Sequence, residues 1–332
     1  MTAVTAVTAV TAVTAVTVRV PAKINLQLAV GALRADGYHE LVSVLMSVGL
    51  FDELTAELAD TPAVTVEGAE SAGVPPDRSN LAMLAVDRLA AHTGRAPGVR
   101  LRIRKNIPAA AGLAGGSADA AAALLACDRL WDTRLSLDEL GAIGAQLGSD
   151  VPFTLIGGVA VGEGRGEKLT PLTVSDSFHW VLAFGTDGLP TPAVYRQCDR
   201  LRAARGPGQP PDSGQRACVD PAILRALRSG DVQALATSLG EPGSRNDLSA
   251  AALSLCPELR RTLAAGLEAG GLAAFVSGSG PTCVFLAEDA ERAEQIVNGL
   301  RASGTCRAVR AVIGPAAGAT VAAAEEGGGN GR

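Results

Sequence analysis

Residues 108–125, PAAAGLAGGSADAAAALL, place a glycine-punctuated loop directly before an alanine-rich stretch of high helix propensity. A helix N-terminus attracts phosphate, because its first backbone N–H groups are unpaired and the helix dipole is positive there. Glycine lets the backbone approach an anion without a side chain in between. Gly112, Gly115, Gly116 and the hydroxyl of Ser117 provide these features. The segment alone fits both a phosphate cradle and a plain strand-to-helix connection with Ser117 as the N-cap.

Two other glycine motifs for nucleotides do not occur in the sequence. The G-x-x-x-x-G-K-[ST] pattern is missing, since no Lys-Ser or Lys-Thr pair follows a glycine loop. Residues 162–168, GEGRGEK, have Glu167 where G-x-G-x-x-G requires its third glycine. This segment lies between two strand-like runs, so it predicts a hairpin turn.

The elements that would position the loop are strands and helices in mixed order. Alternating polarity predicts a strand interrupted at Pro21, a second strand after the Asp36-Gly37 turn, and a third whose arginines face solvent. Helical spacing, caps and stops predict the helices. The strands are expected at residues 18–30, 39–48 and 99–104, and the helices at residues 79–94 (capped by Ser79 or Asn80 and stopped by Gly94), 115–131 and 136–148, the last with a Ser136–Glu139 capping box.

The rest of the chain continues the mixture. Residues 149–172 predict a turn and a hairpin, with Pro152 pushing Val151 toward extended geometry. The remaining segments predict helix, helix, strand pair, helix and strand at residues 220–239, 255–270, 273–287, 288–302 and 306–314, after a Gly/Pro-rich loop near 204–217.

This order favours an α+β fold in two domains, 18–172 and 173–315, because clean βαβ regularity is missing. The first 17 residues repeat the triplet TAV, which matches neither helix nor strand periodicity, so we expect them to be disordered. We expect the same of the tail, residues 316–332.

Composition excludes several classes of protein. The chain has 332 residues, 47% of them hydrophobic, and a formal net charge of −5, which argues against a general nucleic-acid or acidic-membrane binder. Its six cysteines are far apart, which predicts neither a zinc site nor a disulfide framework. Its apolar runs are too short for a membrane span. We therefore expect a cytoplasmic protein with reduced cysteines and no protein-held metal.

Three motifs in a fixed order now resemble a known superfamily. PAKINLQL (21–28), PAAAGLAGGSADAA (108–121) and SGSGPTCVF (277–285) are similar to segments of the small-molecule kinases that include galactokinase, homoserine kinase and mevalonate kinase. RADGYHEL, LGSDVPF and LPTPAVY resemble the branch that acts on a cytidine-diphosphate sugar alcohol, and the likeness covers about residues 18–314.

The resemblance implies a fold and a reaction. The implied N-terminal domain is like the second domain of a ribosomal small-subunit protein, and the implied C-terminal domain is ferredoxin-like. The implied reaction moves the γ-phosphoryl of ATP to the 2-hydroxyl of a cytidine-diphosphate-linked methylerythritol, in non-mevalonate isoprenoid synthesis.

The resemblance also assigns catalytic roles. Asp150 is the expected base for the acceptor hydroxyl, and Lys23 is expected to keep that carboxylate ionised and to favour developing charge. The plainer alternatives are a turn or capping aspartate and a solvated strand lysine.

The acceptor site is implied by the same segments. Tyr38 and Tyr195, the only tyrosines, are expected to stack on the cytosine, and His39 to read its edge. Asn25 is expected to hydrogen-bond the substrate near Lys23, and Thr191 is a further contact. Each of these could instead be an ordinary partly buried aromatic or polar turn residue.

For ATP, Asn80 and Lys105 are implied nucleotide contacts, and Gly278 to Thr282 of SGSGPT are expected to support the loop and the acceptor site. The loop is richer in alanine than is usual among relatives, and Asp119 stands where some relatives have a neutral amide; it would cap the helix or lie near Mg²⁺. Mg²⁺ is expected as the partner of ATP, without a dedicated protein cage. The cradle itself comprises Pro108, Ala109, Ala110, Ala111, Gly112, Leu113, Ala114, Gly115, Gly116, Ser117 and Ala118.

Three alternative functions remain beside this one. A homoserine or mevalonate kinase would have no base to stack between the tyrosines. A catalytically silent sensor would be favoured by loss of Lys23 or Asp150, and both are present. A nucleic-acid module conflicts with the acidic charge and with only 3% aromatic residues. We expect a small-molecule partner and a monomer or weak homodimer.

Overall fold

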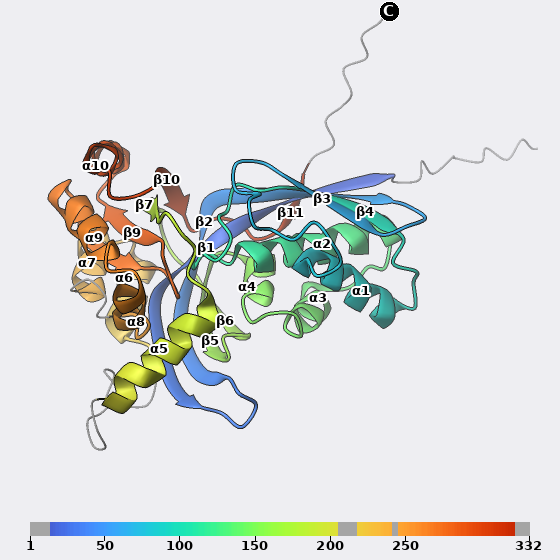
Figure 1. Ribbon diagram of the computed structural model, residues 1–332, viewed down its shortest axis with the longest axis horizontal. Coiled ribbons are helices and arrows are strands. Elements are labelled where there is room, and N and C mark those ends of the chain that lie inside the picture. Colours follow the sequence, from blue (N-terminus) through green and yellow to red (C-terminus); the bar gives the residue numbers. More distant parts are fainter. Residues whose placement is uncertain (1–13, 205–217, 241–244, 323–332) are drawn as a thin grey trace, which may run out of the picture.

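The computed structural model describes residues 14–204, 218–240 and 245–322 (Figure 1). Its first sheet has the strand order β11-β1-β2-β4-β3, with β5 paired to β2 and β6 paired to β5. All these pairs are antiparallel except β3 with β4. The strands are β1 (Ala15–Leu33), β2 (His39–Leu58), β3 (Ala63–Glu67), β4 (Val99–Arg104), β5 (Val159–Gly164), β6 (Lys168–Leu172) and β11 (Thr320–Val321).

Four helices accompany this sheet, and α2 is the central one. They are α1 (Leu81–Thr93), α2 (Gly115–Trp131), α3 (Leu137–Gly144) and α4 (Val151–Ile156). The run of alanines at 120–123 is fully buried, because small side chains let α2 lie close to β1 and β2. Figure 1 shows α1, α2, α3 and α4 grouped beside the sheet.

The second sheet is antiparallel, with the order β10-β7-β9-β8. Because successive side chains of a strand point to opposite faces, Trp180 and Val181 of β7 belong to different apolar cores. Helices therefore cover both faces of this sheet. The elements are β7 (Phe178–Phe184), β8 (Ala273–Val276), β9 (Cys283–Ala287), β10 (Ala308–Gly314), α5 (Thr191–Ala204), α6 (Pro221–Ser229), α7 (Val232–Leu239), α8 (Ser249–Leu255), α9 (Leu259–Glu268) and α10 (Ala290–Ser303).

The long β1–β2 hairpin connects the two halves. Its first part lies in the core with α2, whereas Leu28 and Val30 pack into the core of the second sheet. The backbone N–H of Leu28 donates to the carbonyl of Arg245 at 2.8 Å. In Figure 1 the hairpin reaches down beside α5. A site between the two halves therefore lies beside the β1–β2 hairpin, which runs from one half into the other.

The two-part α+β organisation predicted from the sequence is confirmed, and so are several local signals. Asn80 caps α1 and Gly94 ends it in left-handed geometry, the Ser136–Glu139 capping box is formed, and the arginines of β4 are exposed. No disulfide joins two cysteines within the described residues. The expected loop at 205–217 lies outside the described residues.

Three expectations are wrong. The chain is ordered from Ala15, because Val16 and Val18 share a buried face of β1. Residues 316–322 are ordered too, since β11 pairs with β1. Residues 151–156 form helix α4, with Val151 helical, because a proline in a first turn removes an N–H that has no helical partner. Residues 1–13 and 323–332 lie outside the described part.

Candidate active site

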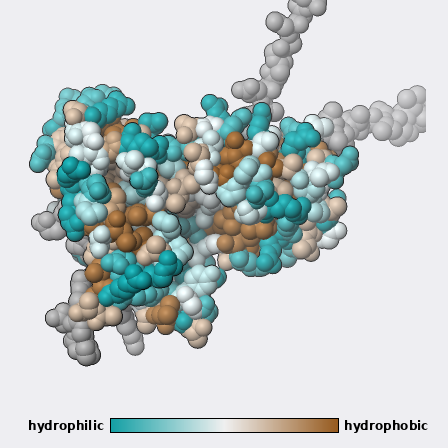
Figure 2. All heavy atoms as spheres, viewed as in Figure 1, coloured by the Kyte–Doolittle hydropathy of each residue, from teal (hydrophilic) through white to brown (hydrophobic). Residues whose placement is uncertain are grey.

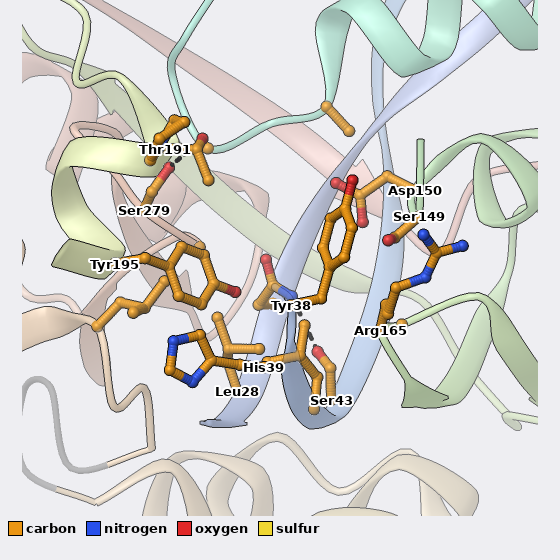
Figure 3. Close-up of a pocket in the computed structure, with 18 of the residues that line it drawn as sticks. Leu28, Tyr38, His39, Ser43, Ser149, Asp150, Arg165, Thr191, Tyr195 and Ser279 are labelled. Carbon is orange, nitrogen blue, oxygen red and sulfur yellow. Dashed lines mark hydrogen bonds between the residues drawn. The ribbon is translucent and has the colours of Figure 1, made fainter. Parts of the chain in front are cut away.

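A cavity of about 630 Å³ lies between the two halves of the molecule. Its walls come from β1, the β1–β2 turn, the loop before α2, the start of α4, the start of α5 and the loop after β8. Figure 2 shows apolar side chains gathered on both halves of this face. Figure 3 shows the lining side chains pointing inward from these separate elements.

The loop before α2 has an unusual backbone. Ala110, Gly112 and Ala114 all have positive φ, at 50°, 76° and 61°. Ala114 is the N-cap and makes no side-chain cap, so Ser117 is not the N-cap of the plainer interpretation. The first backbone N–H groups of α2 are therefore not capped by a side chain and are available to bind an anion.

The loop after β8 supports this backbone, as expected from the sequence. The Ser277 hydroxyl donates to the Gly112 carbonyl at 2.9 Å. A Cβ on Gly112 would lie 2.0 Å from the Ser277 carbonyl oxygen, so a side chain cannot fit there. The SGSGPT segment thus sets the position of the glycine loop.

Lys23 brings the catalytic candidates together. Its Nζ lies 3.6 Å from Oδ2 of Asp150, donates to Oδ1 of Asn25 at 2.6 Å and donates to the Gly112 carbonyl at 3.1 Å. The Lys23 side chain is only 6% exposed, so it is not a solvated strand lysine. Asp150 occupies the N-cap position of α4 without making a capping bond, which leaves its carboxylate facing Lys23 and the cavity.

Ser43 holds Asn25 in place, a role that no sequence motif indicated. The Asn25 amide donates to the Ser43 hydroxyl at 2.8 Å, and that hydroxyl donates to the Gln27 carbonyl at 2.7 Å. These two hydrogen bonds orient the side-chain oxygen of Asn25 toward Lys23.

The aromatic candidates line the other end of the cavity. The His39 ring stacks on Tyr195 with centroids 5.4 Å apart, and its Nε2 lies 3.4 Å from Oδ2 of Asp199. Tyr38 is 53% exposed, and the Arg165 guanidinium lies 4.9 Å from its ring centroid. Figure 3 shows Tyr38 and Tyr195 on opposite sides of the cavity. Burial raises the pKa of Tyr195 above its ordinary value, so the phenol stays protonated.

The remaining candidates divide between the cavity and the core. Thr191 lines the cavity, and its hydroxyl lies 3.0 Å from that of Ser279. Within the loop, Leu113 and Ala118 are buried and could offer only backbone groups. A second cavity of about 260 Å³ borders Pro108, Ala109 and Ala111, so the loop separates two cavities.

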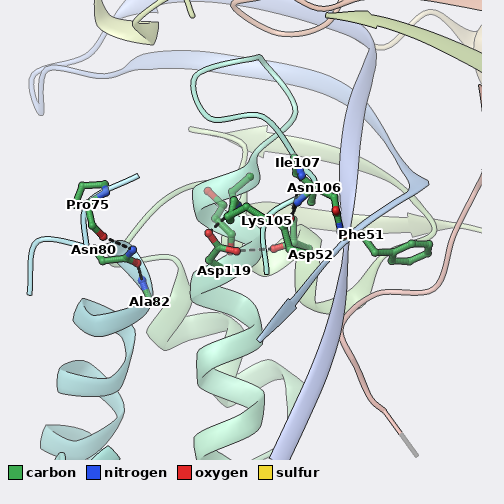
Figure 4. Close-up of polar contacts among 12 residues, drawn as sticks. Phe51, Asp52, Pro75, Asn80, Ala82, Lys105, Asn106, Ile107 and Asp119 are labelled. Atoms are coloured by element: carbon green, nitrogen blue, oxygen red, sulfur yellow. Dashed lines mark hydrogen bonds and ion pairs between the residues drawn. The ribbon is translucent and has the colours of Figure 1, made fainter. Parts of the chain in front are cut away.

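Asn80 and Lys105 are not brought to either cavity. The Asn80 amide caps α1 and donates to the Pro75 carbonyl at 2.8 Å. Lys105 is 1% exposed and pairs with Asp52 and Asp119 (Figure 4). The structure therefore does not support direct nucleotide contact by these two side chains, because both are hydrogen-bonded or ion-paired to internal partners. Asp119 likewise neither caps α2 nor is open to a metal ion.

Asp52 is a further residue that the sequence analysis missed. Its signal was present, since Leu50, Asp52 and Leu54 occupy the buried positions of an alternating strand. A carboxylate at such a position requires partners.

Among the described residues, acidic, histidine and cysteine side chains form no cluster suited to a metal ion. No helix in the described part of the chain is long and apolar enough to cross a bilayer.

Comparison with known proteins places this geometry in a family. Residues 80–158 match the family described as GHMP kinases N terminal domain, and residues 223–306 match GHMP kinases C terminal. A 4-diphosphocytidyl-2-C-methyl-D-erythritol kinase of Streptomyces coelicolor is 56% identical over 92% of this chain and 98% of that protein. One from Nocardia farcinica is 53% identical over 92% of this chain and 95% of that protein.

Solved structures agree. A crystal structure of 4-(cytidine 5'-diphospho)-2C-methyl-D-erythritol kinase is 34% identical, with a TM-score of 0.69 over 90% of this chain and 99% of that one. The mevalonate kinase of L. major shares the fold at 17% identity, with a TM-score of 0.71 over 90% of this chain and 96% of that one. The chain therefore belongs to the GHMP kinases, in the family of 4-diphosphocytidyl-2-C-methyl-D-erythritol kinases.

Proposed function

We propose that this chain transfers the γ-phosphoryl group of ATP to the 2-hydroxyl of 4-diphosphocytidyl-2-C-methyl-D-erythritol, a step of non-mevalonate isoprenoid biosynthesis. One observation carries the proposal. Lys23 contacts Asp150 and the glycine loop in the same cavity whose other end presents Tyr38, His39 and Tyr195. Phosphoryl transfer and recognition of a base are thus supported within one site.

The chemistry follows from the Lys23 contacts. The acceptor oxygen forms a bond to the γ-phosphorus, the bond to the β,γ-bridging oxygen breaks, and the hydroxyl proton passes to Asp150. The Lys23 ammonium stabilises the negative charge that develops on the transferred group. The open N–H groups at the start of α2 bind the phosphates, and ADP leaves.

Mg²⁺ would arrive with ATP and neutralise phosphate charge. Asp119, the one carboxylate near the start of α2 that the sequence suggested for it, is buried against Lys105 and does not fit.

The aromatic end favours the cytidine substrate over homoserine or mevalonate. Stacking on aromatic rings contributes about 1–3 kcal/mol per base. An acceptor without a base could not stack on Tyr38 or Tyr195.

The test follows ADP release with Mg-ATP and cytidine-diphosphate methylerythritol, homoserine and mevalonate in parallel. We expect turnover of the first alone, and a fall of about 10²–10⁴-fold in kcat for Asp150→Asn. Asp138→Asn, which changes an exposed carboxylate, is the matched control. Turnover of another acceptor would refute the substrate, and undiminished kcat in Asp150→Asn would refute the base.

We also propose a fold for the C-terminal domain and a boundary between the two domains. The order β7, helices, β8, β9, α10, β10 with the sheet order β10-β7-β9-β8 supports a ferredoxin-like C-terminal domain. Residues 173–177, between β6 and β7, are the proposed domain boundary. The ribosomal-protein likeness, the cytoplasmic location and the monomer or weak homodimer stay predictions.

A further inference from the structure

A cluster of charged side chains lies beneath the glycine loop, outside both cavities (Figure 4). It consists of Asp52 from β2, Lys105 just after β4 and Asp119 from α2. These residues are 0%, 1% and 2% exposed. No substrate can touch them without rearrangement of the core.

The cluster holds both ends of the loop. At the start, Oδ1 of Asp52 accepts the backbone N–H groups of Asn106 at 2.6 Å and Ile107 at 2.9 Å. At the end, Nζ of Lys105 donates to the Gly115 carbonyl at 3.3 Å and to Asp119 at 2.8 Å. The ion pair of Lys105 with Asp52 joins the two sets of bonds. The span from Asn106 to Gly115 is thereby closed at its base.

The charges do not balance when all three groups are ionised. Burial and then the charge of Asp52 act against Lys105 to raise the pKa of Asp119 to about 7. Burial lowers the pKa of Lys105, but the two carboxylates outweigh it and hold the value above its usual range. Oδ1 of Asp119 is buried with no hydrogen-bond partner. One proton on Asp119 would make the cluster neutral.

A buried ion cluster of this kind adds little net stability compared with apolar side chains of the same volume. Its bonds do, however, specify one geometry for the backbone that they hold. That geometry matters here, because displacing a binding group by about 1 Å can reduce a rate by about 100-fold.

We propose that Asp52, Lys105 and Asp119 form a brace of positioning residues that fixes the separation of the loop ends, and thereby the direction of the N–H groups that hold the ATP phosphates. The brace rests on the proposed kinase function only in taking ATP as the ligand. It acts through the loop and touches no substrate.

The first test measures binding of a non-hydrolysable ATP analogue with Mg²⁺, and the KM of each substrate, in Asp52→Asn. The amide oxygen still accepts the two N–H groups, but the charge that holds Lys105 is lost. We expect the affinity for the analogue to fall by about tenfold, with less than about a twofold change in KM for the acceptor.

Asp128→Asn is the matched control. Asp128 is a buried aspartate near the other end of α2, where it accepts the Leu135 N–H at 2.8 Å and the Thr133 hydroxyl at 2.7 Å. Its loss should lower the unfolding temperature and leave analogue affinity unchanged. Unchanged affinity in Asp52→Asn, or equal changes in both variants, would overturn the brace.

If Asp52→Asn fails to fold, Asp119→Asn provides a second test of the brace. An ionised Asp119 leaves a net negative charge beneath the phosphates, so the wild-type affinity should weaken relative to Asp119→Asn as pH rises from 6 to 8. ATP titrates in this range as well, so the ratio of the two proteins is the readout. A constant ratio would contradict the brace. Turnover of a different alcohol with these affinity changes intact would refute the proposed function alone.

Discussion

At the scale of single residues, Tyr195 is the aromatic side chain best supported for base recognition, since it stacks on His39 and lies half-buried in the cavity wall. We expect Tyr195→Leu to raise the KM for the cytidine substrate by about 5–150-fold, the equivalent of the ~1–3 kcal/mol of one stacked base. Tyr195→Phe should stay within about threefold, because the ring is retained. Steady-state kinetics with ATP in excess measures both. Equal losses in Leu and Phe variants would show that the hydroxyl, and not stacking, matters.

Asp119 gives a prediction about stability and pH. Its folded-state pKa of about 7 lies above its ordinary value of 3.8, so the folded protein binds this proton more tightly than the unfolded chain. Its contribution to the free energy of unfolding is therefore largest at low pH and is lost as pH rises toward and through 7. We expect the unfolding temperature of Asp119→Asn, relative to wild type, to be higher at pH 8 than at pH 5.

Cys127→Ala is the control for that measurement. It lies buried on the same helix, and burial raises the pKa of its thiol to about 12, so it does not titrate in this range. Its effect on the unfolding temperature should be the same at both pH values. A pH-independent difference for Asp119→Asn would remove the basis of the prediction.

At the scale of elements, the glycine loop depends on its contact with the loop after β8. Gly112→Ala would place a Cβ 2.0 Å from the Ser277 carbonyl oxygen at a φ of 76°, so one of the two loops must move. We expect kcat/KM for ATP to fall by at least about 100-fold. Gly94→Ala, at a positive φ with no atom within 4 Å, carries similar backbone strain away from the site and serves as control.

If both alanine variants lose activity equally, loss of global stability and not loop position would explain the result. Circular dichroism of both proteins distinguishes these cases.

At the scale of the whole molecule, the chain returns from the second sheet to the first through residues 316–322. The Ala316 carbonyl accepts the N–H of Gly158 and the hydroxyl of Ser47, and the N–H of Ala319 donates to Thr154. A chain ending at Pro315 loses these bonds and β11, so we expect its free energy of unfolding to fall by about 2–5 kcal/mol. Chemical denaturation measures it. A chain ending at Ala322 is the control, and equal stability of the two would contradict the prediction.

Local patterns were sufficient for much of this molecule. The alternation in residues 99–104, the cap at Asn80, the capping box at Ser136 and the stop at Gly94 each depend on neighbours within a few residues, and each has the predicted form. The three separated motifs were sufficient for the family. The strand character of Ala15–Thr17 was hidden by the triplet repeat.

Contacts between distant segments were decided only by tertiary structure. The sequence by itself determined the glycine loop, the types of the candidate residues and part of the order of the elements, but it did not predict β3, α4, β7, α5 or β11. It could not determine that Lys105 pairs with Asp52, that Lys23 reaches both Gly112 and Asp150, or that residues 316–322 return to β1. Burial made the difference, because a charged side chain enclosed by the packed core must take whichever partner the fold brings near, and periodicity reports only which face a residue occupies.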